Sequence, residues 1–474
     1  MFYILFALIF VITALTSLGI AKKKGTEFIE HIIKFSAISF IVLSMIDVFL
    51  PDLFMCMHGT ETLGSMSGAE FHAIIRWFNL VSFTVLPIAI WQKNKYFERI
   101  ASFFCLPVSI LNVACFYQYI EYFTANSNSG LQTMRVIPQG FKDLLVNEAF
   151  RSVFFGLTCL CQLIALLLLT YKNRKKLTVA KSEIVNLMMI LVGVIYISMP
   201  IYAPQYLWGL VNIMMTRFSW IHIVWIVAII AIITVLYFAF KNKSYEIRYL
   251  LVLALSWALM LQFSQMFTAS FELNIMKLPL QLCNLGSYLA LLMLLTKNEK
   301  IYHFALVVNV VGAIIAIVVL DVNKIYAQLT NLWTVHYIVE HTKVLAVPIL
   351  CLALRIFKPI NMKSIKHFSI GFTVYYLFVL ALGTVSNGFY RIYEGEYIQN
   401  FFYANHLFMF DKGIARGLVG FTDPLFENCV IKLGAFEIYP LVQGLVYLVF
   451  MAICLGVYML FYLLTKGQRK REAE

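Results

Sequence analysis

The chain contains few charged residues for its length. Asp, Glu, Lys and Arg together make up 13% of its 474 residues, whereas about 25% of the residues in soluble domains are charged. Hydrophobic residues account for 61% of the chain, and the mean hydropathy is +0.83. This composition leaves no room for a sizeable soluble domain and predicts an integral membrane protein.

The sequence also lacks the cysteine spacing of a disulfide framework or a zinc site. Its nine cysteines are spread over both halves, mostly within apolar runs, and no two form a C-x-x-C pair. Structural zinc sites and small disulfide-rich folds need closely spaced cysteines, so we expect no bound metal and no cofactor. The first apolar run has no basic segment before it and no A-x-A site after it, which favours a membrane span over a cleaved signal peptide.

Apolar runs long enough to cross a bilayer, which takes about 20 residues, recur along the chain. Lys and Arg gather in every second connection, and this positive-inside pattern predicts a cell-membrane protein with its N-terminus outside and its C-terminus in the cytoplasm. The formal net charge of +13 therefore indicates anchoring in the membrane, with lipids as partners and no nucleic acid. The thirteen expected spans lie near 2–20, 33–51, 74–92, 99–121, 147–171, 183–203, 219–240, 248–269, 278–296, 302–320, 333–354, 367–386 and 437–465.

The second half of the chain repeats the layout of the first. When Asn79 is laid on Asn284, and Lys93–Asn94 on Lys297–Asn298, the apolar runs coincide with a slip of one residue between these anchors. An even number of helices separates the copies, so both cross the membrane in the same direction, which defines a parallel repeat. Two unrelated bundles of similar hydropathy would be the alternative.

The fold class predicted from these patterns is an all-α, polytopic membrane helical bundle. It consists of about thirteen transmembrane helices in two parallel tandem repeats of about six helices, followed by one C-terminal helix. We expect a degenerate N-terminal repeat over residues 1–218. The second domain, over residues 219–474, would hold the functional site.

Four ionisable side chains gather in the expected span 333–354: His336, Glu340, His341 and Lys343. Charges inside a membrane are costly and usually face a cavity or one another. Positions i, i+4 and i+7 share one face of a helix, so His336, Glu340 and Lys343 would lie together. A polar seam between helices would pair the same groups, so the cluster by itself predicts either a site or a structural contact.

Cys283 lies at a similar expected depth on the helix predicted to begin at Leu278. With 1.5 Å per residue, the thiol would be about 7–8 Å below the outer end, a depth that permits contact with a histidine. A thiolate is the reactive form of cysteine, and a nearby histidine can accept its proton. Gln281 and Asn284 could then donate to an oxyanion. A small buried apolar residue is the ordinary role of a free cysteine.

Asn387 follows the expected span 367–386 and precedes a segment rich in aromatic and charged residues, NGFYRIYEGEYIQNFFYANHLFMFDK. This segment is compatible with a lid over the site or with an aromatic belt at the headgroups. The substrate-binding candidates are Asn387, Gln281, Asn284 and Lys343, beside the catalytic candidates Cys283, His336, His341 and Glu340.

The motifs LPLQLCNL and HYIVEHT, with Pro348 and Asn387 downstream, make residues 219–465 resemble the YwaF-type integral membrane proteins of bacteria. That superfamily includes animal proteins implicated as cysteine-dependent phospholipid acyltransferases. The resemblance implies that Cys283 is the nucleophile and that His336 and His341 are its histidines. Many members have a histidine where this chain has Gln281, so that position departs from the family pattern.

Three functions fit these observations. The first is a membrane-embedded lipid acyltransferase or acyl hydrolase that uses a Cys–His pair near the outer leaflet. The second is a proton-coupled secondary transporter in which Glu340, Lys343 and His336 couple protons or bind an anionic substrate, because parallel repeats with charges at mid-membrane are typical of carriers. The third is a structural assembly protein whose polar cluster joins helices.

Overall fold

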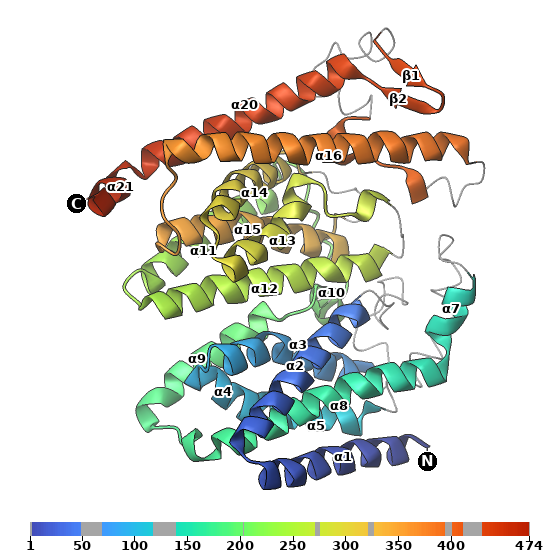
Figure 1. Ribbon diagram of the computed structural model, residues 1–474, viewed down its shortest axis with the longest axis vertical. Helices are drawn as coiled ribbons and strands as arrows, with labels where there is room; N and C mark the ends of the chain where they lie inside the picture. The colour runs from blue at the N-terminus through green and yellow to red at the C-terminus, as the bar shows by residue number, and fades with distance from the viewer. Residues whose placement is uncertain are drawn as a thin grey trace. The chain divides into compact units, whose positions relative to one another are not determined.

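A computed structural model describes residues 2–48, 69–116, 139–201, 203–270, 275–320, 327–393, 401–410 and 429–473. Almost all of them are helical (Figure 1), which confirms the predicted all-α membrane bundle. The chain divides into two compact units. The first unit contains Met1–Ile213, Ser264–Phe271 and Gln328–Val335, and the second contains Met214–Phe263, Glu272–Ala327 and His336–Glu474.

The first unit is built from the N-terminal helices, and α4, η2 and α5 form one continuous run in which η2 is a π-helical turn. Its elements are α1 (Phe2–Lys24), α2 (Thr26–Val48), α3 (Ala69–Trp91), α4 (Lys95–Ile100), η2 (Ala101–Cys105), α5 (Leu106–Ala114), α7 (Gln139–Val146), α8 (Glu148–Asn173), η3 (Arg174–Lys176), α9 (Lys181–Ile197) and α10 (Ala203–Trp208).

The second unit contains the longer helices and a small antiparallel hairpin in which Ile431 lies opposite Ile438. Its elements are α11 (Trp220–Phe240), α12 (Tyr245–Ser270), η4 (Ile275–Lys277), α13 (Leu282–Thr296), α14 (Glu299–Val319), α15 (Leu332–Ala353), η6 (Met362–Ser364), α16 (Ile365–Ile392), η7 (His406–Phe408), β1 (Ile431–Leu433), β2 (Phe436–Ile438), α20 (Pro440–Leu464) and α21 (Lys466–Ala473). The last residues of α12 and the first residues of α15 belong to the first unit.

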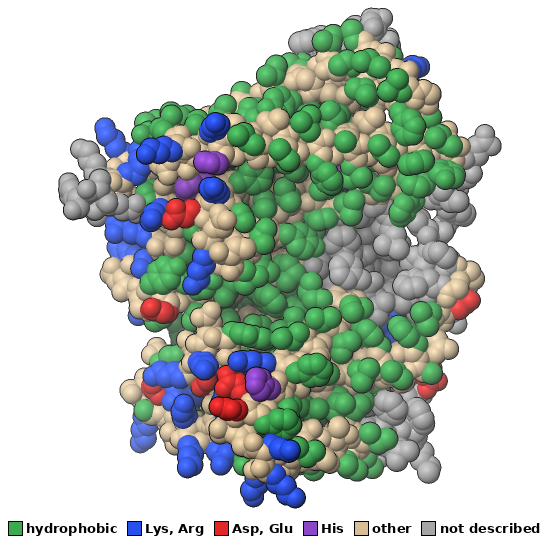
Figure 2. All heavy atoms as spheres, in the orientation of Figure 1, with side chains coloured by type: hydrophobic (Ala, Val, Ile, Leu, Met, Phe, Trp, Pro, Cys, Tyr) green, Lys and Arg blue, Asp and Glu red, His purple; other side chains and the backbone are tan. Residues whose placement is uncertain are grey.

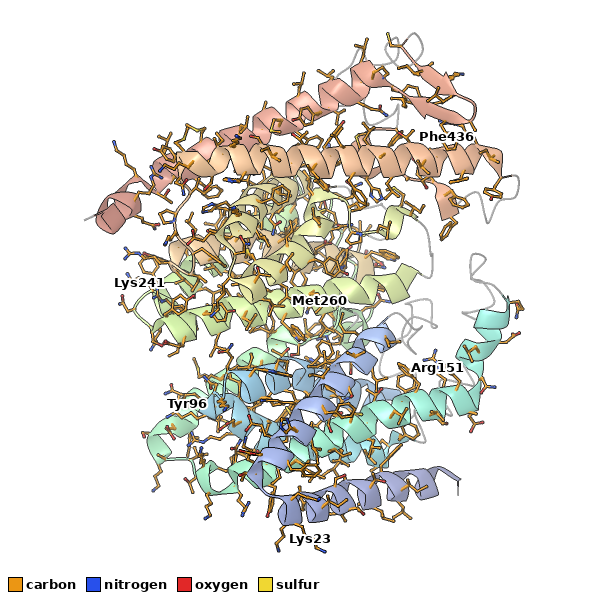
Figure 3. All side chains as sticks on the ribbon, in the orientation of Figure 1. Lys23, Tyr96, Arg151, Lys241, Met260 and Phe436 are labelled. Carbon is orange, nitrogen blue, oxygen red and sulfur yellow. The ribbon has the colours of Figure 1, made fainter. Side chains whose placement is uncertain are left out.

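The expected spans fall on helices of the structure. Within the described residues, nine helices are long and apolar enough to cross a membrane, and the apolar stretches Trp77–Trp91 and Leu282–Thr296 are shorter. The number of thirteen crossings stays a prediction. The end of α16 differs from the expected one, because the helix continues to Ile392 instead of ending near residue 386, so Asn387 lies inside the helix. The hairpin packs on this last part of α16, where the ring of Phe436 lies against Gly388 (Figure 3).

The Lys–Asn pairs that suggested the repeat form the same turn in each unit. Lys93 and Lys297 have positive φ angles of 48° and 51°. The asparagine that follows each of them is the N-cap of the next helix: Asn94 accepts from two backbone N–H groups of α4, and Asn298 from two of α14. Such a cap stabilises a helix by about 1 kcal/mol. The shared geometry supports the predicted duplication, which otherwise stays a prediction.

Basic residues mark one end of the second unit, which we call the basic end. It comprises the turn between α11 and α12, the turn between α13 and α14, and the turn after α15. Lys241 lies there at the end of α11 (Figure 3). Figure 2 shows Lys and Arg at one edge of each unit and hydrophobic side chains over its middle, as expected for helices that cross a bilayer.

Candidate functional site

Cys283 lies in the first turn of α13, whose N-cap is Gln281. The helix therefore begins four residues after the expected start at Leu278, and the thiol is not buried a full turn below its end. Tertiary contacts explain the shift, because the hydroxyl of Tyr375 donates to the carbonyl of Leu280 and holds the backbone before α13 outside the helix.

The thiol of Cys283 is surrounded by polar groups of its own helix. Its Sγ lies 3.2 Å from Oδ1 of Asn284, to which it donates. The backbone N–H groups of Cys283 and Asn284 lie beside the sulfur. A helix N-terminus favours negative charge, so this position suits an oxyanion formed next to the sulfur.

Two glycines bring α14 against the Cys283 helix. A Cβ atom added to Gly312 would lie 2.8 Å from the backbone nitrogen of Cys283, and one added to Gly286 would lie 2.8 Å from Oδ1 of Asn309. Nδ2 of Asn309 also donates to the carbonyl of Gly286 over 3.1 Å. Small residues of this kind allow close helix packing in membranes, and here they fix the height and rotation of the first turn of α13.

Glu340 is the centre of the polar cluster on α15. It is 3% exposed, and its Oε2 lies 2.9 Å from Nε2 of His336. Its other oxygen, Oε1, receives no hydrogen bond from the described residues. Ser287, one turn after Cys283 on α13, has its hydroxyl beside the Glu340 carboxylate. Because Ser287 and Cys283 are four residues apart and share one helix face, the thiol lies on the side of α13 that is near Glu340.

His341 is held by the backbone of its own helix. Its Nδ1 lies 2.7 Å from the carbonyl oxygen of Tyr337 on its own helix, and the two rings are 4.2 Å apart. Since a carbonyl only accepts, Nδ1 of His341 carries the proton. In the described part of the chain, no hydrogen bond joins Cys283 to His336 or His341, so the expected Cys–His pair is not formed directly.

Lys343 is separate from the cluster around Glu340. Its ammonium donates to Oε1 of Gln262 on α12, and within the described residues it forms no ion pair with a carboxylate. Next to it, Oγ1 of Thr342 accepts from the indole N–H of Trp225 over 2.9 Å. These contacts join α15 to α11 and α12. Lys343 therefore lies near the middle of a membrane helix and has a neutral hydrogen-bond partner.

Gln281 and Asn387 bind the backbone of residues 401–410, which we call the strap. Gln281 accepts from the N–H of Leu407 over 3.1 Å and donates to the carbonyl of Asn405 over 3.5 Å. Asn387 accepts from the N–H of Ala404 over 3.1 Å and donates to its carbonyl over 2.6 Å. Both amides are thus occupied in holding the strap instead of lying free for a substrate.

Sequence reasoning missed three residues of this site: Ser287, Gly312 and Tyr375. Ser287 could have been predicted, because it lies four residues after Cys283 and therefore on the same helix face. The other two act through tertiary contacts between helices that the sequence pattern does not order. Among the described residues, no group of three or more His, Cys, Asp or Glu side chains is placed to hold a metal ion.

Residues 214–455 match the TMEM164 family. The chain belongs to the TMEM164 family. The match covers every candidate site residue and leaves the first 213 residues outside it. No curated protein and no solved structure shows a significant similarity to the chain. Membership of this membrane protein family agrees with the helical bundle, while the activity has to be argued from the site.

Proposed function

We propose that the second unit of this TMEM164-family protein is an enzyme that transfers or hydrolyses an acyl chain of a membrane lipid, with Cys283 as nucleophile. The observation that carries the proposal is the buried Glu340 carboxylate. One of its oxygens is held by His336, the other has no donor among the described residues, and Ser287, one turn after Cys283 on α13, lies beside the carboxylate. The resemblance to YwaF-type proteins supports the same chemistry.

In the first half of the proposed reaction, the sulfur of Cys283 attacks the carbonyl carbon of a lipid ester. The Glu340–His336 pair accepts the thiol proton, a C–S bond forms, and the C–O bond to the lipid alcohol breaks as that alcohol takes up the proton. In this proposal the backbone N–H groups beside the sulfur stabilise the negative charge on the carbonyl oxygen. A hydroxyl group or water then attacks the thioester, the C–S bond breaks and the thiol is restored.

This assignment modifies the roles expected for the histidines and amides. His336 acts through Glu340, and His341 supports the helix through Tyr337 instead of serving as the base. Gln281 and Asn387 position the strap. The site lies at the end of the unit opposite the basic end, so the positive-inside pattern leads us to infer that it faces the outer leaflet of the cell membrane.

Mass spectrometry of protein purified with native lipid tests the proposal. We expect a hydroxylamine-labile acyl group on Cys283 that is absent after Cys283→Ala. Glu340→Gln and His336→Ala should slow its formation, whereas His341→Ala should retain more of it than His336→Ala. A free thiol in every preparation, together with full cellular function of the Cys283→Ala variant, would end the enzyme hypothesis.

Proton-coupled transport is a second candidate because Lys343 lies in the membrane with only a neutral partner among the described residues. A buried amine of this kind can exchange a proton during a carrier cycle. The two functions differ in their sensitive residues: transport should be lost in Lys343→Met and kept in Cys283→Ala. Uptake assays in proteoliposomes with these two variants separate the candidates.

A further inference from the structure

The strap descends along α16 instead of crossing its end. The hydroxyl of Ser386 donates to the carbonyl of Phe402, and further along the strap the ring of Phe410 lies against Gly383. At 1.5 Å per residue, Gly383 is about 13 Å below the end of α16 at Ile392. The strap therefore runs from the end of the helix into the bundle.

The opposite side of the strap is pinned to the segment that leads into α13. Besides the Gln281 contacts, the N–H of Asn405 lies 2.7 Å from the sulfur of Met276, and Nε2 of His406 lies 3.0 Å from the carbonyl oxygen of Ile275. Leu407 adopts a positive φ of 58°, which costs energy in a leucine and persists only where the surroundings hold it. Contacts on both flanks thus fix the strap.

The strap is part of the core of the second unit. Leu407 and Met409 are buried in the same apolar cluster as Leu282, the neighbour of Cys283, and Ala404, Asn405 and His406 are buried as well. Cys283 itself is only partly buried. The strap and the residue next to the reactive position thus belong to one core, while the thiol keeps some exposure.

We propose that the strap seals the site from the aqueous phase and that substrate reaches Cys283 laterally from the bilayer. The first turn of α13 lies near the end of a membrane helix, a depth at which the ester carbonyls of a diacyl lipid meet the hydrocarbon. The inference rests on the proposed function in naming the substrate class: the acyl ester of a membrane glycerolipid rather than a water-soluble acyl donor.

Thiol labelling of the full chain in lipid nanodiscs tests the route. Peptide mapping measures how fast two reagents label Cys283 and Cys429, which lies beside the hairpin. One reagent is neutral and membrane-permeant (N-ethylmaleimide), and the other is a negatively charged sulfonate (MTSES). Because a charge is excluded from the membrane, we expect the neutral-to-charged ratio at Cys283 to exceed that at Cys429 by at least about tenfold. The ratio cancels the different thiolate fractions of the two cysteines.

Loosening the strap should change this ratio. Asn387→Ala removes the two bonds to Ala404, and Gln281→Ala, which removes the contacts on the other flank, serves as an independent variant if the first does not fold. Either variant should bring the ratio at Cys283 toward that at Cys429. Equal ratios at the two cysteines in the unmodified protein, or a ratio that is unchanged in a folded variant, would overturn the lateral route.

Labelling needs no turnover, so the two proposals can fail separately. If Cys283 never carries an acyl group but shows the high ratio, the strap still seals the site and the acyl chemistry is wrong. If the acyl group forms while the charged reagent enters freely, the chemistry stands and the sealed route is wrong. Acceptance of a soluble acyl thioester as donor in detergent-free nanodiscs would contradict the assigned substrate class.

Discussion

Replacing Gly312 by alanine should displace the reactive turn of α13. The added Cβ would lie 2.8 Å from the nitrogen of Cys283, 2.8 Å from Cβ of Leu282 and 2.9 Å from its carbonyl carbon. Two of these three atoms are backbone atoms that cannot rotate away. To restore an ordinary contact of 3.4 Å, α13 and α14 must separate by about 0.6 Å, and overpacking of this kind typically costs about 1–3 kcal/mol.

Thermal unfolding of purified protein, followed by intrinsic fluorescence, measures this cost. Gly456→Ala in α20 is a matched control, because nothing lies within 4 Å of its added Cβ and alanine favours a helix by up to about 1 kcal/mol over glycine. We expect Gly312→Ala to lower the unfolding temperature and to slow acylation of Cys283, and Gly456→Ala to lower neither. If Gly312→Ala unfolds no earlier than the control, the close contact does not position Cys283.

Two further predictions concern charged groups. Burial raises the pKa of Glu437, but the Tyr439 hydroxyl and Arg391 outweigh it, so the pKa lies below its usual value. A carboxyl of this kind stabilises the fold above its unfolded pKa of about 4.3 and loses that effect as the pH falls through the folded pKa. The protection factors for hydrogen exchange in the hairpin, which correct for the intrinsic pH dependence of amide exchange, should therefore fall on acidification, and Glu437→Gln should remove this dependence; equal pH profiles of the protection factors would contradict the argument. Lys343→Met should keep or raise the unfolding temperature, because it removes a buried charge whose described partner is the neutral Gln262; a marked fall would reveal an anionic partner.

The positions of the membrane helices followed from the sequence because they depend on local properties. Apolar runs of sufficient length and Lys–Asn turns mark the helices and their connections, and the caps at Asn94 and Asn298 form within a few residues. The i, i+4 spacing likewise predicted that His336 and Glu340 would meet, and their side chains are 2.9 Å apart.

The details that a catalytic assignment needs depend on contacts between distant segments. Pro279 suggested a helix start near Leu278, but the carbonyl of Leu280 is held by Tyr375, which lies 95 residues away, and the helix begins later. A shared depth for Cys283 and His341 did not bring them together, because the His341 ring bonds to the carbonyl of Tyr337. The depth of two side chains in the membrane limits whether they can meet. The rotation of each helix about its axis decides whether they do meet.

The first unit offers a test of the idea that one copy is scaffold and the other a site. Gln162 on α8 is fully buried, and its Nε2 donates to Oδ1 of Asn79 over 2.6 Å and to Oγ of Ser82 over 2.8 Å. In the predicted duplication Asn79 corresponds to Asn284, next to Cys283, so the duplication predicts a structural amide contact in one copy where the other holds the thiol.

Gln162→Ala should therefore destabilise the protein by about 1–3 kcal/mol, the cost of leaving buried polar groups without a donor, and should not change the rate of Cys283 acylation in the protein that remains folded. Glu340→Gln, which keeps the size and one acceptor of its side chain, should do the reverse: slow acylation strongly and shift the unfolding temperature little. Both quantities come from the same preparations by fluorescence and mass spectrometry. A Gln162→Ala protein of normal stability that no longer acylates Cys283 would show that the first unit takes part in the chemistry, because loss of folding could not then explain the loss of activity.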